Sequence, residues 1–255
     1  MDLREVIIKI MEEREVVSLT ELIDILRNMG YEVKAKELYA ELWELERIGM
    51  LKRRYDESFD ILKPATTVKW SLRKKKAEIE ERKKDERDIK LVISVPPLLG
   101  DFKEYCNKFN ALYFLEALEL IIISAENTLR IMCPYIDQTL SNLLVKADLI
   151  RRGDVNVRIL SERRSKISYS SLEYIKMGLR NVDVRYADAY DESGFKKTGV
   201  HAKCVSADDK MLLLGSFNIT VTHIITDLDL GLLIFGPIVK TFNKMFDEIW
   251  EFYER

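Results

Sequence analysis

The sequence contains few of the residues that build metal centres or disulfide frameworks. It has 2 histidines and 3 cysteines among 255 residues. The cysteines, Cys106, Cys133 and Cys204, are odd in number, widely spaced and form no C-x-x-C pair. This pattern excludes a disulfide scaffold and a cysteine zinc site, and we expect reduced cysteines in an intracellular protein.

Long uncharged apolar runs are also missing. No such stretch approaches the roughly 18 residues that a membrane-spanning helix needs, and the start, "MDLREVIIKIMEERE", has no signal-peptide core. We therefore expect a soluble, cytoplasmic protein that does not bind membranes. Charged residues make up 33% of the chain, Glu and Lys are abundant, and Gln138 is the one glutamine. That bias is typical of proteins from hot environments.

The first part of the chain has the pattern of a small helical domain. Apolar residues at helical spacing predict helices over 2–13, 18–30 and 34–50. The segments "LKRRY" and "TTVKWSL" then have the pattern of two strands. Three helices followed by a hairpin predict a winged helix-turn-helix domain over 1–72.

The remaining chain is divided by a charged segment. Residues 73–90 hold nine basic and six acidic residues with almost nothing apolar, so we expect an exposed linker that is helical in part. Beyond it, short apolar strands alternate with helices, including one long helix over 102–124. This alternation predicts one α/β layered domain over 91–255.

The stretch "VHAKCVSADDKMLLLGSFN" carries the chemistry of the second domain. His201, Lys203 and Asp208 are spaced as H-x-K-x4-D, and Ser216 and Asn218 belong to a G-S-x-N. In a strand, residues two apart face the same way, so we expect the histidine and lysine side chains to point together. A neutral imidazole can attack phosphorus, the lysine can neutralise a phosphate oxygen, and the hydroxyl and amide can bind other oxygens.

These paired motifs resemble those of the phospholipase D superfamily. The stretch "LRIMCPYIDQTLSNLLVKADLIRRGDVNVRILS" is similar to the family's first strand-helix-strand unit. The resemblance implies a layered α-β-α domain in which His201 forms a phosphohistidine, a second histidine protonates the leaving oxygen, and Lys203 and Asn218 bind phosphate. It also implies that the reaction needs no metal and no cofactor.

The sequence departs from family members that carry the motif twice. It has a single H-x-K, and His223 is followed by two isoleucines. Single-motif members form a twofold dimer, so we expect a homodimer through the catalytic domain, in which the two copies of His201 share one site. Family members often have a glutamate at the position of Asp229, and we expect Asp229, or its neighbour Asp227, to orient His201.

Several of these residues also have a structural interpretation. His201 could be a hydrogen-bonded histidine of the core, although the neighbouring lysine argues against burial. Asp208 completes the motif and is predicted as a catalytic residue, although the sequence "SADDK" is typical of a hairpin turn, which favours a structural role. We expect His223 to lie in a helix and to be non-catalytic, and Cys133 and Cys204 to be small core residues.

Since the net charge is −2, a nucleic-acid partner must be bound by a local patch. Residues 47–76 hold ten basic and three acidic residues, whereas the third helix is rich in glutamate, which would repel phosphates. The loop "SERRSK" is a second candidate, with a plain solvated loop as the alternative. The predicted nucleic-acid-binding residues are Lys52, Arg53, Arg54, Lys69, Arg163 and Arg164.

These observations favour a metal-independent phosphodiesterase, a homodimeric nuclease whose winged helix helps to bind DNA. Dimerisation or protein binding by the winged helix stays open. One alternative function is a transcription regulator whose phospholipase D-like domain senses a ligand. Another is a phospholipid phosphodiesterase, for which the sequence shows neither a membrane-binding surface nor a secretion signal.

Overall fold

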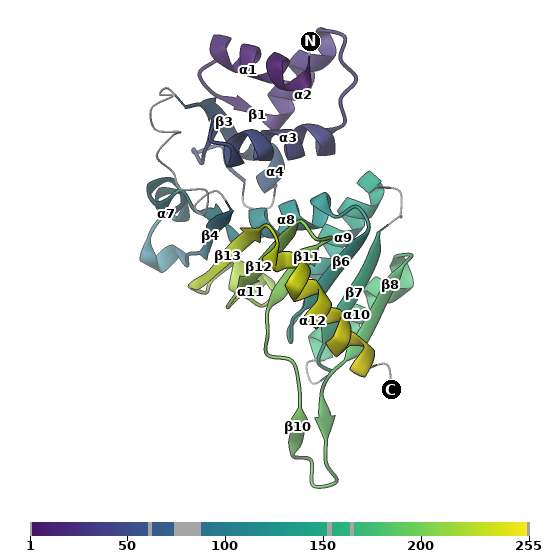
Figure 1. The fold of residues 1–255 in the computed structure, drawn as a ribbon. Helices are drawn as coiled ribbons and strands as arrows, with labels where there is room; N and C mark the ends of the chain where they lie inside the picture. The colour runs from purple at the N-terminus through teal and green to yellow at the C-terminus, as the bar shows by residue number, and fades with distance from the viewer. Residues whose placement is uncertain (1, 61–62, 74–87, 152–154, 164–165, 254–255) are drawn as a thin grey trace. The chain divides into compact units, whose positions relative to one another are not determined.

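The computed structural model describes residues 2–60, 63–73, 88–151, 155–163 and 166–253, with the backbone alone for 146–151 and 166–168 (Figure 1). Most of the charged linker predicted over 73–90 lies outside these residues. The chain forms two compact units, one of Met1–Lys90 with Lys103–Ala111, the other of Leu91–Phe102 with Leu112–Arg255. Residues 103–111 therefore group with the first unit, although the sequence pattern placed them in the second domain.

The first unit has the topology of a winged helix. Helices α1 (Leu3–Glu13), α2 (Leu19–Asn28) and α3 (Ala35–Arg47) precede the antiparallel pair β2 (Leu51–Arg54) and β3 (Lys69–Leu72). A short strand that the sequence pattern did not predict, β1 (Val17–Ser18), pairs with β3 and gives the order β1-β3-β2. The turn α4 (Pro64–Thr67) occupies the start of the predicted second strand.

Local sequence explains where α2 begins. The Ser18 hydroxyl accepts a hydrogen bond from the Glu21 amide, and the Glu21 carboxylate accepts one from the Ser18 amide at 2.8 Å. This reciprocal pair satisfies two backbone donors that a helix start leaves unpaired. Helix α3 then buries Leu38, Leu42 and Leu45 on the face that the leucine spacing predicts.

The prediction of one long helix over 102–124 is wrong. The structure has α7 (Phe102–Phe109), the two-residue strand β5 (Leu112–Tyr113) and α8 (Phe114–Ser124). Asn110 ends α7 because its φ of 51° lies in the left-handed region, outside the helical range. Within the first unit, the amide side chain of Asn107 donates to the Tyr55 carbonyl at 3.0 Å.

The second unit is built on an eight-stranded mixed sheet with the order β5-β4-β13-β12-β11-β6-β7-β8. Strands β6, β7 and β8 are parallel, and β11 is antiparallel to both β6 and β12. The remaining bounds are β4 (Ile89–Ser94), β6 (Thr128–Met132), β7 (Asn156–Ser161), β8 (Val182–Tyr186), β11 (Cys204–Ala207), β12 (Met211–Gly215) and β13 (Asp229–Phe235).

Helices cover this sheet on both faces, as expected for a layered α-β-α domain (Figure 1). Helix α12 (Ile238–Phe252) crosses one face, and α8, α9 (Gln138–Arg151) and α10 (Lys166–Gly178) lie on the other. On the buried face of α12, its residues Phe246 and Trp250 stack with ring centroids 5.8 Å apart and are fully buried. Smaller elements are η1 (Pro97–Leu99), α11 (Val221–Ile225) and the hairpin of β9 (Ala189–Tyr190) and β10 (Lys196–Thr198).

The helices also bear on the expectation about membranes. In the described ranges, no helix is long and apolar enough to cross a bilayer.

Candidate active site

The strand registers bring the motif residues to one edge of the sheet. Cys204, the first residue of β11, pairs with Met132 at the end of β6 and with Leu214 near the end of β12. Gly215 in turn pairs with Gly231 near the start of β13. The ends of β6 and β12 and the starts of β11 and β13 therefore form a common rim, as the sequence predicts.

Phe217, the variable residue of G-S-x-N, anchors the loop after β12. Its buried ring stacks on Phe114 of α8 with centroids 4.0 Å apart and planes 3° apart. The ring lies so close to Gly215 and Gly231 that a Cβ atom at either position would collide with it. Both positions therefore need glycine for this close approach, and the packed ring fixes where Ser216 and Asn218 lie on either side of it.

His201 and Lys203 precede β11 and are not part of a regular strand, which corrects the expectation of alternating faces. His201 and Ala202 are both exposed, and Lys203 is half-buried. The Lys203 Nζ donates to the His201 carbonyl at 2.9 Å and lies 3.5 Å from the His201 Nε2. The two side chains thus meet through the folded-back lysine, and the imidazole remains open to solvent.

A cavity of about 500 Å³ lies next to His201. It is open to solvent and is lined by the end of α12, the segment 199–202 and the ends of β6 and β7. Its walls are mostly apolar, with a few polar side chains, and are formed by Met132, Leu160, Val200, His201, Glu248, Ile249, Phe252 and Tyr253.

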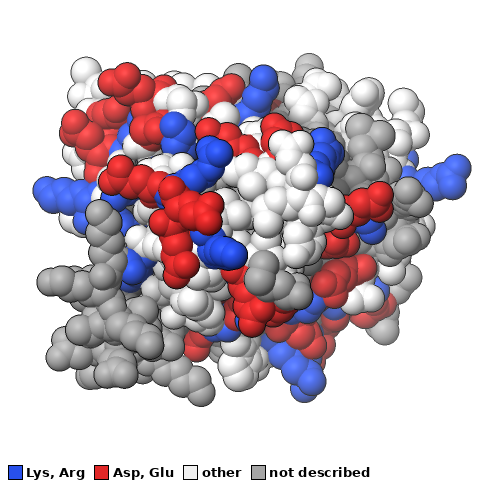
Figure 2. Space-filling model, turned by 90° about the horizontal axis from the view of Figure 1, so that it is seen from above, with Lys and Arg blue, Asp and Glu red and all other residues white. Residues whose placement is uncertain are grey.

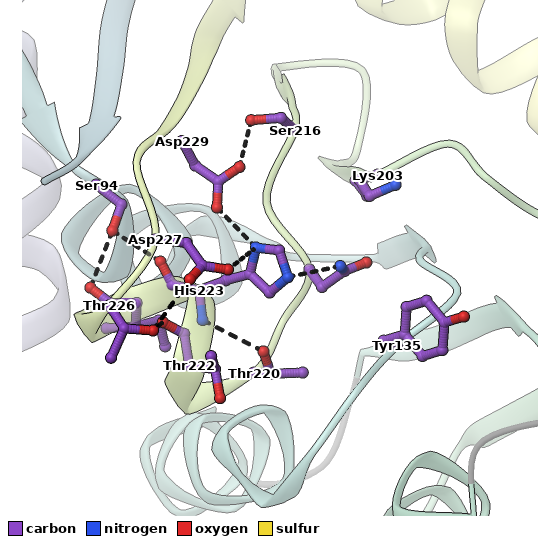
Figure 3. Close-up of polar contacts among 12 residues, drawn as sticks. Ser94, Tyr135, Lys203, Ser216, Thr220, Thr222, His223, Thr226, Asp227 and Asp229 are labelled. Atoms are coloured by element: carbon purple, nitrogen blue, oxygen red, sulfur yellow. Dashed lines mark hydrogen bonds and ion pairs between the residues drawn. The ribbon is translucent and has the colours of Figure 1, made fainter. Parts of the chain in front are cut away.

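The other histidine, His223, is held by Asp229, which was predicted to orient His201, and by Asn218, which was predicted to bind phosphate. Its Nδ1 lies 2.7 Å from Asp229 Oδ2, and its Nε2 lies 2.8 Å from the Asn218 amide nitrogen. The hydroxyl of Ser216 donates to the other carboxylate oxygen of Asp229. In Figure 3 the His223 imidazole lies between Asp229 and the side where Lys203 and Tyr135 are found.

This arrangement corrects the prediction that Asp229 orients His201. The carboxylate of Asp229 contacts His223, and within the described residues no carboxylate contacts the His201 ring. His223, predicted to be non-catalytic, lies on α11 inside the hydrogen-bond network of the motif. Its position a few residues after Asn218 in a chain with two histidines was the available signal, but the sheet register that turns Asp229 toward it could not be read from the sequence.

The neighbouring strands hold α11 firmly. The hydroxyl of Ser94, at the end of β4, donates to the carbonyls of His223 and Ile224 at 2.7 and 2.9 Å. The Tyr113 hydroxyl also donates to the Ile224 carbonyl. At the other end, the Thr220 hydroxyl accepts from the His223 amide at 3.4 Å. Fixed backbone at both ends keeps the imidazole in one place.

Three side chains here could hold a divalent cation. One ligand atom each from His223, Asp227 and Asp229 lies within 4.8 Å of the other two. The Nδ1 of His223 faces both carboxylates, at 2.7 Å from Asp229 and 3.4 Å from Asp227. A cation bound there would have to replace the proton that Nδ1 shares with Asp229.

Asp208 lies at the far end of β11 from His201, in the turn between β11 and β12. Its carboxylate accepts hydrogen bonds from the amides of Glu126, Asn127 and Thr128 at 2.8 to 2.9 Å. Its backbone has a φ of 50°, which aspartate tolerates in turns. The catalytic assignment of Asp208 is therefore wrong, and the carboxylate instead ties the hairpin to the start of β6.

Cys133 and Cys204 are buried side chains of the core. Burial raises the pKa of the Cys133 thiol to about 11 and that of Cys204 to about 12. Neither thiol can therefore provide a thiolate near neutral pH. The Cys133 Sγ lies 3.8 Å from the Asn218 carbonyl oxygen, so Cys133 helps to orient the amide.

The predicted nucleic-acid-binding residues of β2 lie on both faces of this strand. Lys52 and Arg54 are exposed, whereas Arg53 is buried and pairs with Glu46 at 2.5 Å. Arg53 also lies over the Trp43 ring at 4.4 Å. Because successive residues of a strand face opposite ways, Arg53 points into the core, and its assignment to nucleic-acid binding is wrong.

Lys69 and Arg163 are the other described members of the predicted basic set. Lys69 pairs with Asp56 at 2.6 Å, which holds the pKa of that carboxyl at about 2. Arg163, just after β7, is exposed, and its guanidinium lies 4.9 Å from the centre of the Tyr186 ring. Arg164 lies outside the described residues. On the face drawn in Figure 2, basic side chains are interspersed with acidic ones.

Solved structures with similar folds include three of interest. NucT from Helicobacter pylori is 18% identical with a TM-score of 0.47, covering 64% of this chain and 97% of its own. Nuc from Salmonella typhimurium, a phospholipase D family member, is 17% identical with a TM-score of 0.45, covering 64% and 95%. TrmBL2, an archaeal chromatin protein with a novel mode of DNA binding, is 16% identical with a TM-score of 0.39, covering 94% and 88%.

Family membership rests on the sequence match. No match is found among the curated proteins. The family described as "Cardiolipin synthase, PLD-like domain" matches residues 118–250, which is more than half of the chain and includes every residue of both motifs. The chain therefore belongs to the phospholipase D-like family.

Proposed function

We propose that the chain is a metal-independent phosphodiesterase that hydrolyses DNA or RNA through a phosphohistidine. The observation that carries this proposal is the shared rim, where His201 and Lys203 directly precede β11, and Ser216 and Asn218 follow its antiparallel neighbour β12. An imidazole, an ammonium group and neutral donors at one edge of a sheet suit a tetrahedral phosphate.

The exposed imidazole of His201 is the nucleophile. Its attack forms a nitrogen–phosphorus bond and breaks the bond to the leaving oxygen, and water later displaces phosphate from the histidine. Lys203, already within 3.5 Å of the His201 Nε2, neutralises charge on the phosphoryl oxygens during both displacements. Asn218 and Ser216 supply hydrogen-bond donors once the substrate displaces their present partners.

A nucleic-acid substrate is supported by the surface charge of the wing. Lys52 and Arg54 project from the same face of β2 and are both exposed. Two cations spaced two residues apart on a strand can contact phosphates of one backbone. DNA is the substrate we propose first, with RNA as the second.

The homodimer predicted from the sequence stays a prediction. Beside Asp229, the side chains of Leu228, Leu230 and Leu232 are 58, 56 and 41% exposed, and this apolar surface could be covered by a second copy. Sedimentation of the purified chain at low concentration is expected to show two chains. A fully active monomer would contradict the dimer.

The activity is tested by incubating the purified chain with single-stranded and duplex DNA and RNA in EDTA, beside His201→Ala. Cleavage by the wild type and loss of cleavage in the variant are expected. Equal cleavage by both proteins, or none by the wild type on any substrate, would refute the nuclease. Activity that needs an added divalent cation would refute metal independence.

A second candidate function is that of a regulator whose phospholipase D-like domain binds a small molecule. The observation in its favour is the apolar cavity beside His201, with a winged helix in the same chain. Duplex DNA binding without hydrolysis of nucleic acid or of phosphatidylglycerol vesicles would favour this function. Hydrolysis of the vesicles alone would favour a phospholipid phosphodiesterase.

A further inference from the structure

The proposed reaction needs a second acid–base group, because the leaving oxygen must take a proton when its bond to phosphorus breaks. The resemblance assigns this role to a histidine from another copy of the chain. Within one chain, His223 is the second of only two histidines, and it is half-buried at the rim that carries His201. His223 is therefore a candidate for this acid–base group, provided that its hydrogen bonds suit proton transfer.

The contacts of His223 indicate which ring nitrogen carries the proton of the neutral imidazole. Asp229 accepts a hydrogen bond and cannot donate one when ionised, so the nitrogen 2.7 Å away, Nδ1, carries the proton. The Asn218 nitrogen lies 2.8 Å from Nε2, and an amide nitrogen only donates, so Nε2 has a free electron pair. A carboxylate that fixes the tautomer and stabilises the imidazolium is what a histidine general acid–base requires.

Hydrogen bonds hold both carboxylate oxygens of Asp229. Its side chain is 7% exposed, its Oδ1 accepts from the Ser216 hydroxyl, and its Oδ2 contacts His223. A buried carboxylate needs such partners, because burial of an unpaired charge is costly. In this state, the single hydroxyl proton of Ser216 is used to orient Asp229.

A short line of contacts connects the two histidines. The Nε2 of His223 contacts the Asn218 amide, whose oxygen lies 3.8 Å from the Cys133 sulfur. The positive charge of Lys203 is near enough to the Cys133 thiol to lower its pKa, against the larger, opposite effect of burial. Lys203 in turn lies 3.5 Å from the His201 Nε2. In Figure 3, Lys203 lies on the side of the His223 ring to which Nε2 points. A phosphate bound by Lys203 and Asn218 would therefore lie between the two imidazoles.

We propose that His223, oriented by Asp229, is the proton donor and acceptor for His201 of the same chain, an inference that rests on the proposed phosphodiesterase activity. The reacting form of His223 is the imidazolium, in which the substrate has displaced the Asn218 amide and Nε2 has taken up a proton from solvent. As His201 attacks phosphorus, the leaving oxygen takes this Nε2 proton. The neutral Nε2 then takes a proton from the water that displaces phosphate, which restores both histidines. Each turnover consumes one water and leaves the protons balanced.

The dependence on the leaving group tests this role. Bis(p-nitrophenyl) phosphate releases p-nitrophenolate, which needs little protonation, whereas a dinucleotide releases an alkoxide that does. We expect His223→Gln to lower turnover of the dinucleotide by about 10²- to 10⁴-fold and to lower formation of p-nitrophenolate much less. His201→Gln is expected to abolish both. Circular dichroism and the midpoint of thermal unfolding establish that each variant is folded.

Covalent labelling distinguishes the two histidines directly. With a radiolabelled p-nitrophenyl diester, His223→Gln should still form the phosphohistidine, and His201→Gln should not. Glu126→Gln is the control, because the Glu126 carboxylate is 57% exposed and pairs with Lys210 at the Asp208 turn, at the far end of β11 from His201, and this variant should keep wild-type turnover within about threefold.

Three outcomes would overturn the assignment. Dinucleotide turnover by folded His223→Gln within threefold of wild type would show that the acid comes from elsewhere, such as His201 of a second copy. Activity regained on mixing His201→Gln with His223→Gln would show that the two histidines act across subunits. Wild-type protein without activity on either substrate would refute the phosphodiesterase itself, and with it this role for His223.

Discussion

At the scale of single residues, the two histidines differ in what surrounds them. His201 is exposed beside Lys203, while His223 lies between a buried carboxylate and an amide. The first environment leaves an imidazole accessible to a substrate, and the second fixes one tautomer. In the proposed reaction, Asp229 is therefore as important as either histidine.

The variant Asp229→Asn tests whether the carboxylate of Asp229 fixes the tautomer of His223. The amide keeps the size of the carboxylate, but its nitrogen can donate to Nδ1 and so favour the wrong tautomer of His223. We expect dinucleotide turnover to fall by about 10²- to 10⁴-fold, in the range found when a histidine loses its carboxylate partner. The nitrogen chemical shifts of labelled His223 should report the change of tautomer. Unchanged shifts together with abolished activity would contradict this explanation.

A glycine substitution tests the packing of the motif loop. An added Cβ at Gly231 would collide with the Phe217 ring and lie 2.5 Å from the Leu214 carbonyl oxygen, so backbone would have to move. We expect Gly231→Ala to lower the free energy of unfolding by about 1–3 kcal/mol in urea denaturation. Gly178→Ala is the control, because nothing lies within 4 Å of its added Cβ. An equal effect of the two substitutions would argue against this close packing.

At the scale of elements, β2 and α3 of the winged helix are joined by a buried ion cluster. Glu46 pairs with Arg53 at 2.5 Å and with Lys90 at 3.2 Å, and all three side chains are at most 7% exposed. Burial alone would raise the pKa of Glu46, but the two cations and their hydrogen bonds hold it below its usual value. The buried glutamate on α3 is thus what allows Arg53 to point inward.

This depressed pKa predicts how stability depends on pH. The contribution of Glu46 is fully present above the pKa of an unfolded glutamate, about 4.3, and is lost as the pH falls through the lower pKa of the folded state. We therefore expect the winged helix to lose stability below about pH 4. Fluorescence of Trp43 and Trp70, both buried in this unit, follows its unfolding. Stability unchanged down to pH 2 would contradict the prediction.

Removal of the charge should be costly at neutral pH. Glu46→Gln leaves Arg53 and Lys90 buried without their counter-charge, and we expect a loss of about 3–5 kcal/mol in the free energy of unfolding. Glu44→Gln provides the control, because Glu44 pairs with Arg47 where both side chains are about one-third exposed. That change should cost at most about 1 kcal/mol. Similar losses in the two variants would refute a special role for the cluster.

The sequence predicted these elements well where local pattern determines them. Strand β12 and the rim follow from apolar runs and turn residues, and α2 from its capping residues, although β11 begins only after His201 and Lys203. It failed where a tertiary contact decides the outcome. Asn110 interrupts an apolar stretch that has the pattern of one helix, and the inward face of β2 takes Arg53 because Glu46 compensates its charge. Likewise, only the register of β13 shows that Asp229 faces His223.

At the scale of the whole molecule, a net charge of −2 means that nucleic acid must be attracted by a local surface. Lys52 and Arg54 are the exposed cations of β2, while Lys69 is already paired with Asp56. Binding of this kind releases counterions from the nucleic acid and therefore weakens as salt increases. The affinity and its salt dependence should change together when these two side chains are altered.

We expect the double variant Lys52→Gln/Arg54→Gln to bind duplex DNA more weakly, with a plot of log affinity against log salt whose slope is shallower by about 0.9 for each phosphate that the protein no longer neutralises. Fluorescence anisotropy of labelled DNA at several salt concentrations measures both quantities. Lys210→Gln is the control, because Lys210 is 53% exposed but paired with Glu126 at the Asp208 turn. An unchanged slope in the double variant would show that DNA is bound elsewhere, with the loop containing Arg163 as the next surface to alter, since Arg163 follows β7 at the rim that carries His201.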